Sequence, residues 1–227
     1  MNKTSKKTLI CFVIAISFFL IFAAFTAVVT LVDVQAIGPD GSSVGLATLN
    51  KAVFDTLGQN NLWYEATEIL GLIPIAFAGA FALLGLTQAI KRRSVFKVDP
   101  EILLLGALYV FIGIAYVGFE LVEINFRPIL IDGALEASYP STHTMLSVCI
   151  MLTAIYTVNK LMPRIKALIF AADGVCVLLM TVIVVGRLLS GAHWFSDIIA
   201  GLLISIALVS LYYAFVFLVK DKKTKAK

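Results

Sequence analysis

Long apolar runs separated by short polar segments dominate the hydrophobic pattern of this chain. Each run holds about 18 to 26 residues, the length that an α-helix needs to cross the hydrocarbon core of a bilayer. The first run is too long for the apolar core of a secretory signal peptide. The pattern therefore predicts an all-α, polytopic bundle of six transmembrane helices, forming one membrane domain over residues 1–227. The predicted spans are about 8–32, 65–90, 101–122, 142–159, 167–187 and 197–219.

The composition indicates that a bilayer, rather than water, surrounds most of this chain. Hydrophobic residues make up 60% of it and charged residues 14%, with a mean hydropathy of +0.99. A soluble domain averages about half apolar and a quarter charged residues, so a soluble globular protein is excluded. The net charge of +4 follows from membrane topology, as described next, and no nucleic-acid partner is expected. Membrane lipids are the expected surroundings.

The lysines and arginines lie almost entirely in alternate connecting segments. Fifteen of the 18 fall on one side of the membrane if the N-terminus is placed in the cytoplasm. Because positive residues are enriched in cytoplasmic segments, we predict a multi-pass protein of the plasma membrane with both termini in the cytoplasm. Only Lys51, Arg127 and Arg187 then lie toward the outer side.

The longest connection is the outer segment 33–64. Within it Leu46, Leu49, Val53 and Leu57 recur at helical spacing, Ser43 is a possible helix cap, and Gly58 a possible helix end. Two interpretations remain open for this stretch. It is either an interfacial helix lying on the outer leaflet or an ordinary folded loop.

Three short polar patterns lie at the predicted outer ends of the spans. Charged and titratable groups near a bilayer are costly and tend to mark function, and the two histidines of the chain both belong to these patterns. A bundle can bring the patterns together although they are distant in sequence. They are Phe126-Arg127-Pro128, Pro140-Ser141-Thr142-His143 and Arg187-x5-His193-x3-Asp197.

These residue types suit a phosphate group. Two arginine forks match phosphate oxygens, and the amides of a helix that begins near Ser141 form an anion site. If a helix begins near His193, Asp197 lies on the same face and can fix the imidazole tautomer, leaving the other ring nitrogen free to attack. His143 is available as a general acid. These groups suffice for phosphoryl transfer, so no metal site and no cofactor is expected.

The remaining ionisable groups near these patterns are interpreted as structural. Glu65 and Glu68 begin the second span, where a helix-start or interface role is expected rather than catalysis. Asp173 lies inside the fifth span, where we expect a hydrogen bond to a neighbouring helix. Three carboxylates in the loop after the third span are expected to be solvated: Glu123, Asp132 and Glu136.

Together, the three patterns resemble the signature of the type-2 phosphatidic acid phosphatase superfamily. That signature reads Lys-x6-Arg-Pro, then Pro-Ser-Gly-His, then Ser-Arg-x5-His-x3-Asp. The resemblance extends from about Trp63 to the end of the sixth span. It implies a membrane-bound phosphatase that acts on lipid phosphates or diphosphates, usually without a metal.

The resemblance also implies a role for each matching residue. His193 would be the nucleophile that becomes a phosphohistidine, and Asp197 would orient it. His143 would protonate the leaving oxygen and then activate water. The phosphate would be bound by Arg127, Arg187, Ser141 and Thr142.

Three positions depart from the family pattern. Glu120 stands where the family has lysine, which replaces a cation with a carboxylate near an anion site. Thr142 replaces a glycine, and Gly186 replaces a serine. Glu120 is the most serious departure, and no phosphate-binding role is assigned to it.

Three functions remain compatible with the sequence. The first is a lipid phosphatase with its active site on the extracytoplasmic side. The second is a phosphotransferase that passes the phosphoryl group to an acceptor other than water. The third is a non-catalytic lipid-binding or transport protein, which Glu120 and Thr142 favour but the intact histidines and Asp197 oppose.

Overall fold

The structure is a computed structural model that describes residues 3–161 and 166–225. Within these residues it contains seven α-helices and two short 3-10 helices. Six of the α-helices are long and apolar enough to cross a membrane, so the predicted all-α bundle with six spans is confirmed. The elements are α1 (Lys3–Leu31), η1 (Pro39–Gly41), α2 (Ala47–Leu57), α3 (Asn61–Arg92), η2 (Val95–Lys97), α4 (Pro100–Leu121), α5 (Thr142–Leu161), α6 (Lys166–Leu189) and α7 (Phe195–Lys225).

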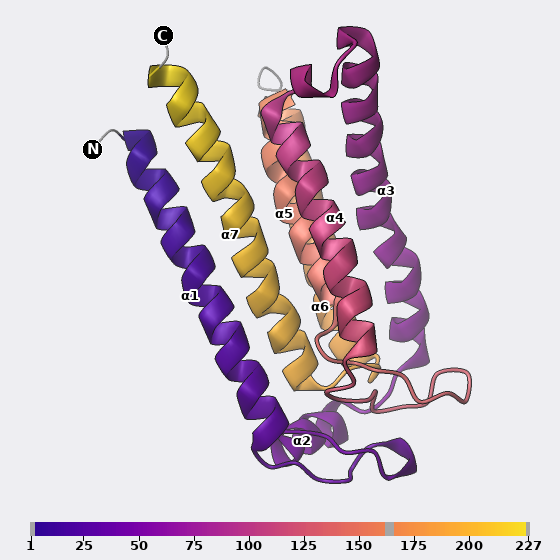
Figure 1. Cartoon of the computed structure of the whole chain (residues 1–227). Coiled ribbons are helices and arrows are strands. Elements are labelled where there is room, and N and C mark those ends of the chain that lie inside the picture. Colours follow the sequence, from indigo (N-terminus) through magenta and orange to yellow (C-terminus); the bar gives the residue numbers. More distant parts are fainter. Residues whose placement is uncertain (1–2, 162–165, 226–227) are drawn as a thin grey trace.

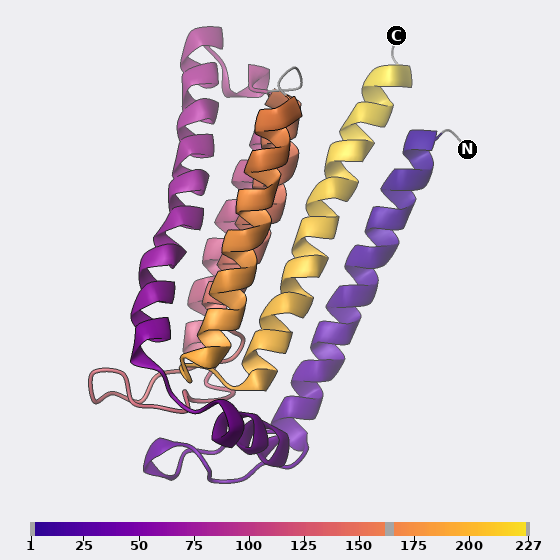
Figure 2. The ribbon, with the colours of Figure 1, turned by 180° about the vertical axis from the view of Figure 1, so that it is seen from behind.

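The six long helices run side by side, and the first turn of α1 and the last turn of α7 lie at the same end of the bundle (Figure 1). Helix α1 packs along α7 at one side of the bundle, and α3 lies at the other side (Figure 2). The two long connections, 32–60 and 122–141, cover the opposite end. All three polar patterns of the sequence therefore meet at the end of the bundle that is remote from the termini.

Helix α5 is the central helix of the bundle. In its most apolar stretch 56% of the residues are buried, against 11% in α1, α3 and α6. Its buried hydroxyls bond within the helix, as Thr153 and Thr157 each donate to the carbonyl one turn earlier at 2.8 Å. Tyr109 on α4 also bonds to Thr153 at 3.0 Å. Because no water is available inside a bilayer, these internal bonds allow α5 to carry polar residues at the centre of the bundle.

The intramembrane carboxylate Asp173 bonds to the neighbouring helix, as its sequence position predicts. Asn159 on α5 donates a hydrogen bond of 3.0 Å to one carboxylate oxygen of Asp173 on α6. This bond pairs two polar groups that would otherwise face apolar surroundings at high cost. Asp173 thus joins α5 to α6.

The outer segment contains a helix, α2, but its start differs from the sequence prediction. The helix begins at Ala47, its cap position is Leu46 rather than Ser43, and no side chain caps it. Gly58 ends the helix as predicted, with a φ of 69°. The helix packs under the start of α7, where Phe54 contacts Trp194 with ring centroids 5.6 Å apart. The segment therefore forms a cover over the end of the bundle that is remote from the termini.

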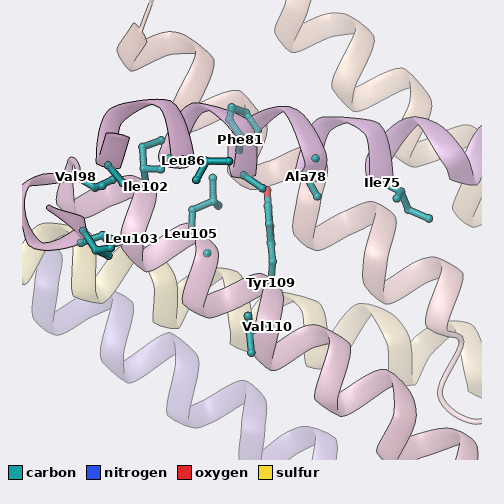
Figure 3. Close-up of a pocket in the computed structure, with 16 residues that line it drawn as sticks. Ile75, Ala78, Phe81, Leu86, Val98, Ile102, Leu103, Leu105, Tyr109 and Val110 are labelled. Atoms are coloured by element: carbon teal, nitrogen blue, oxygen red, sulfur yellow. The ribbon is translucent and has the colours of Figure 1, made fainter. Parts of the chain in front are cut away.

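An apolar groove opens between α3 and α4 near their short connection (Figure 3). Its volume is about 820 Å³, and small residues of α3, including Ala78, Ala82 and Gly85, leave much of the space. A helix rises 1.5 Å per residue, so the groove begins about 10 Å along α3 from Glu68. Its lining is suited to hydrocarbon rather than to polar groups.

Gly45 lets the outer segment pass directly against the end of α1. A methyl group at this position would lie 1.6 Å from the carbonyl oxygen of Val29. The amide of Gly45 also donates to the buried side chain of Asn125 at 3.0 Å. The close approach thus fixes the cover segment to the loop that carries Arg127.

We expect Gly45→Ala to destabilise the protein by about 1–3 kcal/mol, because the backbone must move to admit the methyl group. In detergent the midpoint of thermal unfolding should fall by at least about 3 °C. Gly113→Ala is the matched control, since a methyl group at Gly113 in α4 meets no atom within 4 Å. Equal midpoints for the two variants would contradict the assigned role of Gly45.

Candidate active site

Five segments converge at the covered end of the bundle. The loop 122–141 contributes Arg127, and the first turn of α5 contributes His143. The end of α6 contributes Arg187, and the turn before α7 contributes His193. The fifth segment is the second turn of α3, where Glu68 contacts both Arg187 and His143. The structure therefore brings together the three patterns that the sequence separates.

His193 is held by its Nδ1 atom and leaves its Nε2 atom without a protein partner. Nδ1 lies 3.1 Å from the carbonyl oxygen of Ser138, and a carbonyl oxygen can only accept a hydrogen bond. The proton of the neutral ring is therefore on Nδ1, and Nε2 carries the lone pair. Nε2 is buried and has no hydrogen-bond partner within the described residues. This is the tautomer that a nucleophilic imidazole needs.

The surroundings of His193 keep it neutral. Burial lowers its pKa well below the ordinary value of 6.5, and the positive charges of Arg127 and Arg187 lower it further. A neutral ring keeps the Nε2 lone pair available, whereas an imidazolium would have none.

Asp197 supports His193 less directly than the sequence indicates. Helix α7 begins at Phe195, so His193 lies in the preceding turn and does not share a helical face with Asp197. A carboxylate oxygen of Asp197 lies 3.7 Å from Nδ1 of His193, farther than the Ser138 carbonyl. Asp197 accepts from the Trp194 amide at 2.9 Å and from Asn125 at 3.2 Å. It therefore holds the turn that presents His193.

The turn itself is built by Ser190 and Gly191. The Ser190 hydroxyl donates to the carbonyl of Arg187 at 2.8 Å and accepts from the amide of Ala192 at 3.2 Å. Gly191 has a φ of +70°, a conformation that glycine adopts without strain. These contacts carry the chain from the end of α6 to His193.

Arg187 is fully buried (0% exposed) and offers one edge of its guanidinium group to an anion. Its Nη1 atom donates to Glu68 at 2.7 Å, and its planar group lies over the ring of Tyr64, 5.3 Å from the centroid. Its Nε and Nη2 atoms are buried and have no acceptor within the described residues. Because buried donors without acceptors are costly, this edge indicates a site for an anionic ligand.

Arg127 is held from both sides of the loop 122–141. Its Nε atom forms an ion pair with Glu136 at 3.0 Å that does not meet hydrogen-bond geometry. Its backbone amide donates to the Glu136 carbonyl at 2.9 Å, and the Trp194 indole donates to the neighbouring Phe126 carbonyl at 2.7 Å. The prediction that Glu136 is only a solvated loop charge is therefore wrong, because it neutralises a buried arginine.

The start of α5 supplies Ser141, Thr142 and His143. The amide of Ser141 donates to the backbone carbonyl of Asp197 at 3.0 Å, which ties the second pattern to the third. The hydroxyl of Ser141 accepts from the Thr144 amide at 3.4 Å, close to the upper limit for such a bond. Thr142 lines a small cavity together with His193. The Nε2 atom of His143 lies 3.5 Å from Glu68, and its Nδ1 atom is buried without a partner within the described residues.

Glu68 and two asparagines are the site residues that the sequence interpretation missed. Glu68 was expected to be a helix-start or interface group, but it bridges Arg187 and His143. Asn125 and Asn50 are fully buried and bond across segments, Asn50 to Ser196 in both directions. A carboxylate two turns inside an apolar span is a signal for Glu68, whereas no local pattern marks a buried asparagine.

The three departures from the family pattern have different structural meanings. A methyl group at Gly186 would lie 2.5 Å from a carbon of Thr67 on α3, so no side chain fits there. Glu120, near the end of α4, lines the same small cavity as His193 and Thr142. Its carboxylate has no hydrogen-bond or ion-pair partner among the residues that the structure describes. The departure at Gly186 is therefore accommodated by packing, while Glu120 is an exposed carboxylate on the wall of a cavity that His193 also lines.

The geometry places two buried arginines and two histidines together at one end of a helical membrane bundle, an arrangement that suits a phosphate-like anion. Among residues 3–161 and 166–225 no group of three His, Cys, Asp or Glu side chains could hold a metal ion. The family model described as "PAP2 superfamily" matches residues 77–221, and this chain belongs to that superfamily. The matched range includes five residues of the candidate site: Arg127, His143, Arg187, His193 and Asp197.

A solved structure supports the same fold. The chain is similar to a transmembrane PAP2-type phosphatidylglycerolphosphate phosphatase from Bacillus subtilis, with a TM-score of 0.58 and 16% sequence identity. The alignment covers 92% of this chain and 96% of that one. No curated protein matches this chain in sequence.

The tautomer of His193 can be measured directly, because His143→Gln leaves His193 as the only histidine of an untagged chain. In ¹⁵N-histidine NMR spectra of the detergent-solubilised variant, we expect a protonated Nδ1 and a bare Nε2. The ring should still be neutral at about pH 6, because burial and the arginines oppose its protonation. A proton on Nε2, or an imidazolium at that pH, would contradict this assignment.

Proposed function

We propose that this protein hydrolyses lipid phosphates or diphosphates through a phosphohistidine intermediate. The observation that carries the proposal is the bare, buried Nε2 atom of His193 in a site that also contains two buried arginines. A neutral imidazole lone pair is a nucleophile, and the free guanidinium edge of Arg187 is a partner for phosphate oxygens. Membership of the PAP2 superfamily supports the reaction class.

The reaction has two steps. In the first, the Nε2 lone pair of His193 attacks phosphorus while the P–O bond to the lipid breaks, and His143 gives a proton to the leaving oxygen. In the second, His143 takes a proton from water as the water oxygen attacks phosphorus. The P–N bond then breaks, and its electron pair returns to Nε2. Both steps require a nucleophile placed in line with the leaving group and cations that stabilise the charge on the phosphoryl oxygens.

The remaining residues bind and orient. Arg127 and Arg187 neutralise the phosphate oxygens, and Ser141 and Thr142 lie at the start of α5, where helix amides favour an anion. Asp197 fixes the turn of His193. The lipid tail stays in the bilayer or in the apolar groove between α3 and α4.

The active site faces the outside of the plasma membrane in this proposal. The support is the distribution of lysine and arginine, which favours a cytoplasmic location for the two termini. Because the site lies at the end of the bundle remote from the termini, it is then extracytoplasmic. The substrate is a phosphate group exposed on the outer leaflet.

Glu120 keeps a second function in consideration. Its carboxylate, on the wall of a cavity that His193 also lines, would repel a phosphate bound there, which favours a non-catalytic lipid-binding or transport protein. A phosphotransferase would use the same phosphohistidine and would yield a phosphorylated acceptor instead of free phosphate.

His193→Ala should reduce phosphate release from a panel of monophosphate and diphosphate lipids by at least about 10³-fold, because it removes the nucleophile. Arg187→Ala should also lower the rate, since it removes a phosphate-binding cation. Lys51→Ala is the matched control, because Lys51 is an exposed outer cation paired with Asp55 on α2.

Equal phosphate release by His193→Ala and the parent would exclude this mechanism. Lipid binding without phosphate release across the whole panel would favour the non-catalytic function. Label found in an acceptor lipid or sugar would favour the phosphotransferase.

Glu120→Lys should tighten the binding of inorganic phosphate, lowering its inhibition constant by about 10-fold, because a repulsive charge near the site becomes attractive. Glu120→Gln should give an intermediate value. The matched control is Glu123→Lys, which makes the same charge change three residues away at an exposed position. An equal effect of both lysine variants would show that Glu120 acts only through overall charge.

A further inference from the structure

Glu68 divides its two carboxylate oxygens between two groups of the site. One oxygen lies 2.7 Å from Nη1 of Arg187, and the other lies 3.5 Å from Nε2 of His143. The side chain of Glu68 is 42% exposed, whereas that of Arg187 is 0% exposed. Glu68 thus reaches from the rim of the site to its buried cation.

The contact with Glu68 determines which nitrogen of His143 remains available to donate a proton. A carboxylate can only accept hydrogen bonds, so the Nε2 atom that faces Glu68 carries a proton. The second proton of an imidazolium is then on Nδ1, which is buried and has no acceptor within the described residues. The proton that can be given to a leaving oxygen is therefore the one on Nδ1.

Helix α3 makes a second contact with the His143 ring, through its backbone at Gly71. A methyl group at Gly71, one turn after Glu68, would lie 3.3 Å from the Cδ2 atom of His143. The backbone of α3 therefore packs on the ring while Glu68 faces Nε2. One helix both supports the imidazole and aligns it.

Burial is the largest effect that opposes an imidazolium at His143, and neighbouring cations add to it. The ring has electrostatic contacts with Arg187 on α6 and Arg127 in the loop before α5, and it acts on His193 in the turn before α7. Two of these neighbours are cations, which oppose another positive charge. Glu68 is a carboxylate that contacts the ring, and its negative charge acts against both effects.

The contact with Arg187 does not compete with phosphate. Glu68 uses Nη1, while the Nε and Nη2 atoms form the other edge of the guanidinium group and remain without an acceptor within the described residues. A planar guanidinium can bind one anion at each edge. Glu68 and a phosphate can therefore be bound at the same time.

We propose that Glu68 is a positioning residue that holds His143 in its proton-donating form, with the Nδ1 proton directed to the leaving oxygen. The proposal rests on the proposed phosphatase function. As the P–O bond breaks, its electron pair goes to the lipid oxygen and takes the Nδ1 proton, leaving neutral His143 bonded to Glu68 through Nε2. In the second step Nδ1 takes a proton from the attacking water, which restores the imidazolium.

The test compares two substrates with one tail, dodecyl monophosphate and dodecyl diphosphate. The monophosphate releases dodecyl alkoxide, a strong base that needs a proton. The diphosphate releases dodecyl phosphate, which leaves without one. In single-turnover reactions, Glu68→Gln should slow the monophosphate by about 10²-fold and the diphosphate by less than about 5-fold. Any loss of rate that acts through Arg187 affects both substrates. The ratio of the monophosphate loss to the diphosphate loss therefore isolates proton donation.

Matched variants complete the experiment. Glu65→Gln changes a carboxylate on the same helix that has no contact with the site, and it should leave both rates unchanged. Glu68→Asp keeps the charge and should restore the monophosphate rate to within about 10-fold of the parent. Adding Glu68→Gln to His143→Gln should cause little further loss on the monophosphate, because the two residues act as a unit.

Three results would overturn the proposal. They are equal losses on both substrates, no loss on either, or additive losses in the double variant. If Glu68→Gln does not fold, Gly71→Ala replaces it, because its methyl group would lie 3.3 Å from Cδ2 of His143 and must shift the ring slightly away from its position beside Glu68, which should produce a smaller loss with the same selectivity. A parent protein that releases no more phosphate than His193→Ala would remove the proposed function itself, which separates that failure from failure of the Glu68 role.

Discussion

The burial of two guanidinium groups at one end of a membrane bundle is the constraint on which the rest of the site depends. Arg187 is fully buried and Arg127 nearly so, and burying an unpaired charge costs several kcal/mol. Glu68 and Glu136 each neutralise one arginine. The edge of Arg187 that Glu68 leaves open has no acceptor among the described residues, and an anionic ligand could supply one.

Such a site needs a rigid support, because its charged groups come from distant segments. Buried asparagines provide much of that support. Asn125 bonds to Asp197 and accepts from the Gly45 amide, while Asn50 bonds to Ser196. These bonds join the cover segment, the Arg127 loop and the start of α7, so the position of His193 depends on residues that never contact a substrate.

The departures from the PAP2 pattern concern charge more than shape. Gly186 is fixed by the close approach of α3, where Thr67 occupies the space of a side chain. Glu120 has no such packing reason, and it adds a carboxylate to a cavity that His193 also lines. Relative to the family pattern, one cation near the site is thus replaced by a carboxylate.

The sequence by itself determined the six spans, because each apolar run is long enough to satisfy its backbone as a helix in lipid. It also identified Arg127, His143, Arg187, His193 and Asp197, since polar residues stand out at the ends of apolar helices. It placed the start of α2 incorrectly, because that start has no side-chain cap and is set by contacts with α1 and Asn125.

Only the tertiary structure decided how these residues act on one another. His193 is oriented first by the Ser138 carbonyl and only then by Asp197, because α7 begins after His193 instead of at it. Glu68 and Glu136 are local carboxylates in the sequence and become counter-ions only when helices and loops meet. Which charged groups pair depends on their distance in space. Sequence spacing predicts that distance only for residues within a turn or two of one helix.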